Sequence, residues 1–122
     1  MVLKLYGSPT STCTKRVATI LYLKKIPHEL IAIDLAKKEH KDAAYMEKQP
    51  FGQVPYIDDD GLILFESRAI CRYLEEKYPD HGPTFIPKDA KGKAMFEQAA
   101  SIEMMTFDPC ASKAGYEGFI KK

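Results

Sequence analysis

Hydrophobic residues at the start of the chain alternate with polar ones, which predicts a short strand at residues 2–6. Hydrophobic residues then recur every three or four positions, so we expect a helix that opens at Thr10 or Ser11 and runs to about Lys25. Pro27 ends this helix, because proline lacks the backbone N–H that a continuing helix needs. The chain therefore begins with a strand and an amphipathic helix.

More strands are predicted further along. Residues 28–33 form a β-rich run, and residues 56–57 and 62–65 read as the arms of a hairpin whose acidic and glycine residues 58–61 make the turn. Ser67 is then expected to cap a second amphipathic helix. A right-handed crossover makes the first two strands parallel, and the hairpin completes a small mixed sheet. This βαβ-ββα order predicts an α/β fold with the layout of a thioredoxin-like domain.

The last third of the chain is helical in pattern. Residues 88–107 carry hydrophobic residues on one face, and Asp108-Pro109 is expected to interrupt this helix before Ser112 restarts it. Three prolines and a glycine precede it, which is typical of a linker. The predicted organisation is a domain at residues 1–78, a linker at 79–88 and a helical segment at 89–122.

Composition excludes several classes of protein. With 122 residues, 45% of them hydrophobic and 29% charged, the chain reads as an ordinary globular protein, and a net charge of +1 gives no electrostatic reason to bind nucleic acid or an anionic membrane. No apolar run approaches the roughly 20 residues that span a bilayer, and the N-terminus lacks the apolar core of a signal peptide. Cys13, Cys71 and Cys110 have neither the pairing of a disulfide framework nor metal-binding spacing, so we expect a cytoplasmic protein without a metal.

Two motifs carry the strongest functional signal. Phe51-Gly52-Gln53-Val54-Pro55 places a proline after a β-branched residue where an extended segment begins, and Glu66-Ser67-Arg68-Ala69-Ile70 starts eleven residues after that proline. The second motif puts an acid and a hydroxyl directly before a helix, whose N-terminal N–H groups attract carboxylates. Together they predict a strand edge and a helix N-terminus that hold a peptide with carboxylate groups.

Three further runs of sequence add to these two motifs, at Ser11 to Val17, Glu39-His40-Lys41 and Phe107-Asp108-Pro109. On these five runs the chain resembles the N-terminal domain, linker and first C-terminal helix of a glutathione transferase of phi type or a closely related fungal class. The resemblance implies a cytoplasmic, homodimeric detoxification enzyme that conjugates the thiol of glutathione to small electrophiles. It also implies that an all-α C-terminal domain begins near the end of this chain.

The resemblance assigns the catalytic role to Ser11, at the start of the first helix. A free thiol with a pKa of about 8.5 is only a few per cent ionised at pH 7, and a hydroxyl donor at a helix N-terminus favours the thiolate. The alternative is that Ser11 is only a helix cap. Thr12 is a nearby substitute for this hydroxyl. Cys13 lies two residues beyond the reacting position and is either a partly buried, unreactive thiol or the nucleophile of a thiol transferase.

The resemblance also implies a set of glutathione contacts. Pro55 would follow a cis peptide bond, so that the backbone of Val54 pairs with the cysteinyl unit of glutathione. The side-chain amide of Gln53 would reach the glycyl or glutamyl end. Glu66 and Ser67 would hold the γ-glutamyl amine and carboxylate, although a plain helix cap beside a solvated acid would have the same sequence.

His40 and Lys41 match the family pair that binds the glycyl carboxylate through positive charge. By themselves they are part of a solvated run of charged residues. Phe51 is expected to pack, or to insert into a partner subunit as the corresponding aromatic does in relatives.

The chain departs from the family pattern because it holds only the start of the C-terminal domain. In relatives the electrophile pocket lies largely between the two domains. The chain is therefore a truncated or incompletely represented transferase, a protein that exchanges helices within a dimer, or a protein that binds without conjugating. Besides a glutathione transferase, the sequence leaves open a thiol transferase that depends on Cys13, and a non-catalytic binding or assembly module.

Overall fold

A four-stranded mixed sheet organises the first part of the chain in the computed structural model, which describes residues 2–121. The strand order is β2-β1-β3-β4, with β1 parallel to β2 and antiparallel to β3, and with β3 antiparallel to β4. The predicted thioredoxin-like arrangement is confirmed, including the parallel first pair. The strands are β1 (Leu3–Gly7), β2 (His28–Ala32), β3 (Tyr56–Asp59) and β4 (Leu62–Phe65).

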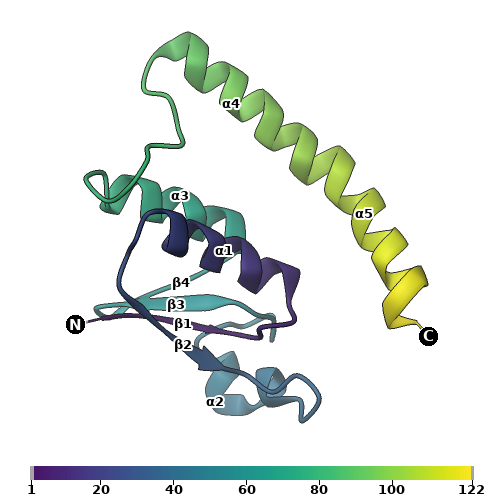
Figure 1. The fold of residues 1–122 in the computed structure, drawn as a ribbon. Helices are drawn as coiled ribbons and strands as arrows, with labels where there is room; N and C mark the ends of the chain where they lie inside the picture. Colours follow the sequence, from purple (N-terminus) through teal and green to yellow (C-terminus); the bar gives the residue numbers. More distant parts are fainter. Residues whose placement is uncertain (1, 122) are drawn as a thin grey trace. The chain divides into compact units, whose positions relative to one another are not determined.

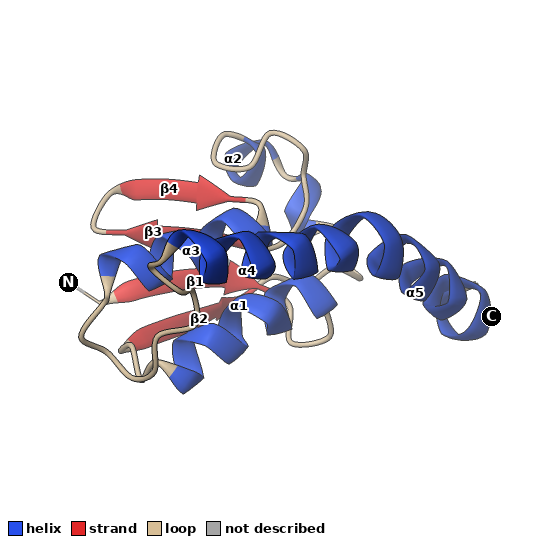
Figure 2. Ribbon diagram, turned by 90° about the horizontal axis from the view of Figure 1, so that it is seen from above, coloured by secondary structure: helices blue, strands red, loops and turns tan. Residues whose placement is uncertain are grey.

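Helices lie on both faces of this sheet. The helices α1 (Thr12–Leu23) and α3 (Ser67–Lys77) cover one face, whereas α2 (Ala43–Met46) lies on the other, after a short 3-10 turn at Glu39–Lys41 (Figures 1 and 2). The helix α1 makes the crossover between the parallel strands β1 and β2, as the sequence pattern predicted.

The core lies between the sheet and the helices α1 and α3. Alternate residues of β1 are buried, so each contributes its side chain to this layer. Burying one such side chain stabilises the fold by roughly 1.5–3 kcal/mol. The buried hydrophobic cluster consists of Leu3, Leu5, Val17, Leu21, Ile26, Ile57, Ile70 and Leu74.

The hairpin turn is shorter than predicted. The strand β3 continues through Asp58 and Asp59, and only Asp60 and Gly61 form the turn, both with positive φ (52° and 93°). Asp59 can lie in the strand because its carboxylate accepts hydrogen bonds from the Tyr73 hydroxyl at 2.6 Å and from the Tyr78 hydroxyl at 3.2 Å. A buried aspartate with such partners no longer acts as a turn residue.

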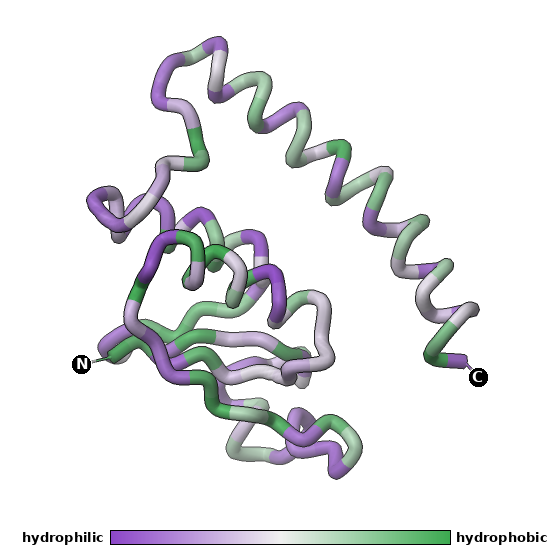
Figure 3. The backbone as a smooth tube through the Cα atoms, in the orientation of Figure 1, coloured by the Kyte–Doolittle hydropathy of each residue, from purple (hydrophilic) through white to green (hydrophobic). Residues whose placement is uncertain are grey.

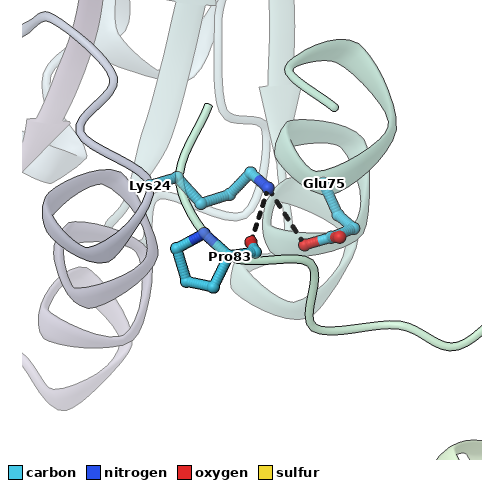
Figure 4. A network of polar contacts seen from close by, with 3 residues as sticks. All are labelled: Lys24, Glu75 and Pro83. Carbon is cyan, nitrogen blue, oxygen red and sulfur yellow. Dashed lines mark hydrogen bonds and ion pairs between the residues drawn. The ribbon is translucent and has the colours of Figure 1, made fainter. Parts of the chain in front are cut away.

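A buried lysine joins the end of α1 to α3 and to the loop that follows it. The side chain of Lys24 is 0% exposed, and its Nζ lies 3.3 Å from Glu75 Oε2 and donates to the Pro83 carbonyl at 3.1 Å (Figure 4). Gly82, with φ +62°, packs against the backbone of Leu23 and Lys24, where a Cβ atom would lie 2.7 Å from its nearest neighbours. The chain is thereby held against the first unit up to Pro83.

Residues beyond Pro83 belong to a second compact unit, and the boundary between Pro83 and Thr84 falls within the predicted linker 79–88. Asp89 caps the first helix of this unit by accepting a hydrogen bond from the Gly92 N–H at 2.7 Å. No helix among residues 2–121 is long and apolar enough to cross a bilayer. The helical segments are α4 (Ala90–Ile102), α5 (Asp108–Gly115) and two π-helical turns, Glu103–Phe107 and Tyr116–Ile120.

The predicted interruption at Asp108-Pro109 is wrong, because these residues begin α5 directly after a π-helical turn. The Asp108 N–H donates to the Glu103 carbonyl five residues earlier, and this wider turn precedes the proline in the first turn of α5. Ser112 accordingly lies within the helix and restarts nothing. Hydrophobic residues recur along the whole unit (Figure 3), and many are exposed, including Met95, Ile102, Met105, Phe107, Phe119 and Ile120.

Candidate functional site

A small cavity of about 70 Å³ lies where the first turn of α1, the loop before β3 and the start of α3 meet. Five predicted binding residues line it, and so does the accessory candidate Cys13. The structure adds two residues that the sequence interpretation did not assign to the site, Gln49 and Arg68. The full lining is Cys13, Gln49, Gln53, Val54, Pro55, Glu66, Ser67 and Arg68.

Tyr45 holds the loop before β3 through a hydrogen bond to the backbone of that loop. The Val54-Pro55 peptide bond is cis. The Tyr45 hydroxyl donates a short hydrogen bond to the Gln53 carbonyl, and its ring packs edge-on against Tyr56 with centroids 5.2 Å apart. Burial raises the pKa of the Tyr45 phenol, so Tyr45 is a neutral donor to this carbonyl. The sequence interpretation missed Tyr45, since only burial distinguishes it within a polar stretch.

The start of α3 differs from the predicted cap. Glu66 occupies the cap position with φ +75°, and its side chain makes no capping hydrogen bond, whereas Ser67 is the first residue of the helix. The prediction that Ser67 is the N-cap is therefore wrong. Its hydroxyl instead accepts a hydrogen bond from Arg16 Nη1 at 2.8 Å, and the same nitrogen lies 3.7 Å from Cys13 Sγ. The guanidinium of Arg16 thus brings positive charge to the residues that line the cavity.

Ser11 is the N-cap of α1. Its Oγ accepts a hydrogen bond from the Thr14 N–H at 3.2 Å, and its own N–H donates to the Ser8 carbonyl at 3.0 Å. Because a hydroxyl can donate while it accepts, the Ser11 proton stays available to a ligand. Ser11 is half-buried and lies outside the lining of the cavity, although Cys13 two residues later is part of it. The accessory candidate Thr12 is exposed.

His40 and Lys41 do not line the cavity but lie beside the loop that does. A Cβ atom on Gly52, which has φ +59°, would lie 3.0 Å from both the His40 carbonyl and Lys41 Nζ. The ammonium group is therefore next to the residue that precedes Gln53. Among residues 2–121, His40 Nδ1 is the one buried side-chain nitrogen or oxygen without a hydrogen-bond partner.

The other cysteines lie outside this cavity. Cys71 is half-buried on α3, and burial raises the pKa of its thiol to about 11. Cys110, on α5, is exposed. No group of three or more His, Cys, Asp or Glu side chains in residues 2–121 is arranged to hold a metal ion.

Fold and site together define a thioredoxin-like domain with a polar cavity beside a cis-proline loop. The sequence profile of the family "Glutathione S-transferase, N-terminal domain" matches residues 5–84. The chain therefore belongs to the glutathione S-transferase family, and the predicted resemblance to phi-type transferases is confirmed.

Individual relatives agree with this family. The chain is 47% identical to "Glutathione S-transferase hmp2" of Hypomyces subiculosus, covering 100% of this chain and 57% of that protein. It is 46% identical to "Glutathione S-transferase PM239X14" of Arabidopsis thaliana, covering 96% and 55% of the two. The chain thus spans little more than half the length of these relatives.

Solved structures give the same picture. Glutathione transferase F7 from Populus trichocarpa superposes with a TM-score of 0.94 at 39% identity, over 98% of this chain and 57% of that one. A second structure, "glutathione S-transferase-I bound with the ligand lactoylglutathione", has a TM-score of 0.86 at 31% identity, over 98% of this chain and 56% of that one. The helical start of a C-terminal domain is present, as predicted.

Proposed function

We propose that this chain is the glutathione-binding part of a transferase that conjugates the glutathione thiolate to small electrophiles, with Ser11 stabilising the thiolate. The observation that carries the proposal is the cavity in which Gln53, Val54 and Pro55 meet Glu66 and Ser67. It lies in a fold whose relatives are named glutathione S-transferases, one of them solved with lactoylglutathione.

Ser11 supports the chemistry through its place in the fold. Its Oγ already accepts one hydrogen bond, so its proton can be donated to a sulfur anion near the N-terminus of α1. Lowering a thiol pKa from about 8.5 by two units makes most of it thiolate at pH 7 and requires about 2.7 kcal/mol of differential stabilisation. The hydroxyl and the helix N-terminus act on the same charge.

The remaining residues would hold the two ends of the tripeptide. The N-terminus of α3, at Glu66 and Ser67, suits the amine and the carboxylate of the γ-glutamyl unit, and Arg16 adds positive charge there. His40 and Lys41 would take the glycyl carboxylate from the other side of the loop. The Gln53 amide and the backbone of Val54 would position the cysteinyl unit between these ends.

A Ser11→Ala chain tests this assignment through the bound thiol. We expect glutathione to bind with unchanged affinity in calorimetry, while the pKa of its thiol, followed by thiolate absorbance, returns toward about 8.5. Conjugation should fall by roughly tenfold or more, the loss expected when an anion-stabilising donor is removed. Ser11→Gly controls for the helix cap, since glycine weakens a cap by only a few tenths of a kcal/mol. An unchanged thiol pKa in both variants would contradict the proposed role.

The proposal extends to a cytoplasmic homodimer. Support for the homodimer comes from Phe51, which is 63% exposed in the loop before β3 and contacts Phe65 edge-on with ring centroids 6.0 Å apart. An exposed aromatic side chain of this kind is typical of interface anchors. Sedimentation of the chain and of a Phe51→Ser variant measures this directly, and an unchanged mass in the variant would argue against Phe51 as the anchor.

A further inference from the structure

Gln49 is the most buried polar residue that lines the cavity, and neither the motifs nor the proposed function gives it a role. The residue is 2% exposed, and it lies between α2 and the cis-proline loop. Even so, it contributes to the lining of the cavity. A buried amide with both a donor and an acceptor group needs a partner for each of them.

Three of the four hydrogen-bonding groups of Gln49 have partners within the protein. The Gln49 N–H donates to the Tyr45 carbonyl at 3.0 Å, and the Gln49 carbonyl accepts from the Gly52 N–H at 3.0 Å. The side-chain Oε1 accepts from the Phe51 N–H at 2.7 Å. Because a backbone N–H can only donate, this contact requires the oxygen of the amide on that side, so the position of Nε2 is settled as well.

The amide nitrogen Nε2 is the remaining group. No acceptor for it occurs among the hydrogen bonds of residues 2–121, and it is not among their buried unpartnered atoms. It therefore remains accessible to a ligand. The other contacts of Gln49 fix the position of this donor. It is therefore pre-organised for the oxygen of a ligand.

We propose that Gln49 Nε2 donates a hydrogen bond to a carbonyl or carboxylate oxygen of bound glutathione, which makes Gln49 a specificity-determining residue of the site. This inference rests on the proposed function. The cavity brings Gln49 together with Gln53 and Val54 on the loop side and with Glu66 and Ser67 on the helix side, so an oxygen that reaches Nε2 belongs to the peptide that spans them. A neutral donor at this point selects a ligand group that accepts and disfavours one that donates.

Gln49 holds the loop through Oε1 alone, whereas the proposed contact with glutathione uses Nε2. The structural role and the binding role can therefore be tested separately. A glutamate at position 49 would still accept the Phe51 N–H through one oxygen. Its other oxygen would replace the donor by an acceptor and repel the oxygen of the ligand. The Gln49→Glu change therefore reverses the proposed contact while it keeps the contact that holds the loop.

Calorimetric titration of the chain with reduced glutathione tests the inference. For Gln49→Glu at neutral pH we expect a dissociation constant raised by about tenfold or more, the size expected for one hydrogen bond within a buried site. The affinity of this variant, relative to the unmodified chain, should recover as the pH falls, because protonation of the introduced carboxylate restores a donor. Gln98→Glu makes the same chemical change at an exposed position of α4 and should leave the affinity unaltered.

Gln49→Met covers the case in which the buried charge unfolds the chain, since it removes the donor without adding a charge, although it also removes the Oε1 acceptor of the Phe51 N–H. Thermal melting identifies which variants are folded, and a folded Gln49→Met chain should also bind about tenfold more weakly. Binding equal to that of the unmodified chain, in a folded Gln49→Met or Gln49→Glu variant, would overturn the inference. No binding by the folded, unmodified chain would instead overturn the proposed function, and the role of Gln49 with it.

Discussion

Replacing Glu75 by leucine should destabilise the first unit more than replacing Lys24 by methionine, although both changes remove the same ion pair. The ammonium of Lys24 is 0% exposed and the carboxylate side chain of Glu75 is 11% exposed. Glu75→Leu leaves a fully buried charge with one acceptor fewer. Lys24→Met leaves a carboxylate that water can reach, and it also removes the donor to the Pro83 carbonyl.

The magnitudes follow from this difference in burial. Removing one partner of a buried pair costs about 3–5 kcal/mol, and we expect the lower end for Glu75→Leu because Pro83 still accepts from Lys24 at 3.1 Å. For Lys24→Met we expect about 1–2 kcal/mol, the cost of a lost hydrogen bond and a partly solvated carboxylate. In a domain of this size, each kcal/mol lowers the melting temperature by roughly 4–8 °C.

Thermal and urea unfolding followed by circular dichroism measure both values, and the double variant completes the cycle. Lys24→Met combined with Glu75→Leu should be more stable than Glu75→Leu alone, since no buried charge remains. Equal losses in the two single variants, or strict additivity in the double variant, would refute the argument from burial.

Three further outcomes are expected. Gly82→Ala should lower the melting temperature more than Gly61→Ala. Both glycines have positive φ (62° and 93°), but a Cβ at position 82 meets backbone atoms 2.7 Å away, whereas nothing lies within 4 Å at position 61; similar losses would contradict this. In kinetics with a thiol reagent near neutral pH, the exposed Cys110 should react first and Cys71 slowly, because burial raises the pKa of the Cys71 thiol to about 11; a fast phase that disappears in a Cys71→Ser variant would contradict it. Burial, with the neighbouring tyrosine and aspartate charges, raises the pKa of Tyr56 from 10.0 to about 12. The folded state therefore favours the neutral phenol. Its contribution to the free energy of unfolding, complete below pH 10, should be lost as the pH rises toward 12. Urea unfolding at several pH values measures it, and a smaller loss in Tyr56→Phe than in the unmodified chain would support the assignment, whereas an identical loss would not.

Much of the fold could be predicted from the sequence because the signals are local. Alternation predicted a strand at residues 2–6, and helical spacing predicted a helix from Thr10 or Ser11 to about Lys25. The structure confirms both elements, as a strand at Leu3–Gly7 and a helix at Thr12–Leu23. The predictions that were wrong concern residues whose usual preference is overridden. Asp59 lies in a strand since two tyrosines bind its carboxylate, and Pro109 begins a helix since a wider turn precedes it.

The sequence by itself determined the order of strands and helices, the family and the two motifs that meet at the cavity. Hydrophobic spacing and local motifs are read within a few residues, and they need no knowledge of distant parts of the chain. Only the tertiary structure decided that Arg16 reaches Ser67, and that Lys24 pairs with Glu75, each across 51 positions. Only the tertiary structure placed the buried residue Gln49 in the lining of the cavity. Such contacts depend on how packed elements meet in space, which no local pattern records.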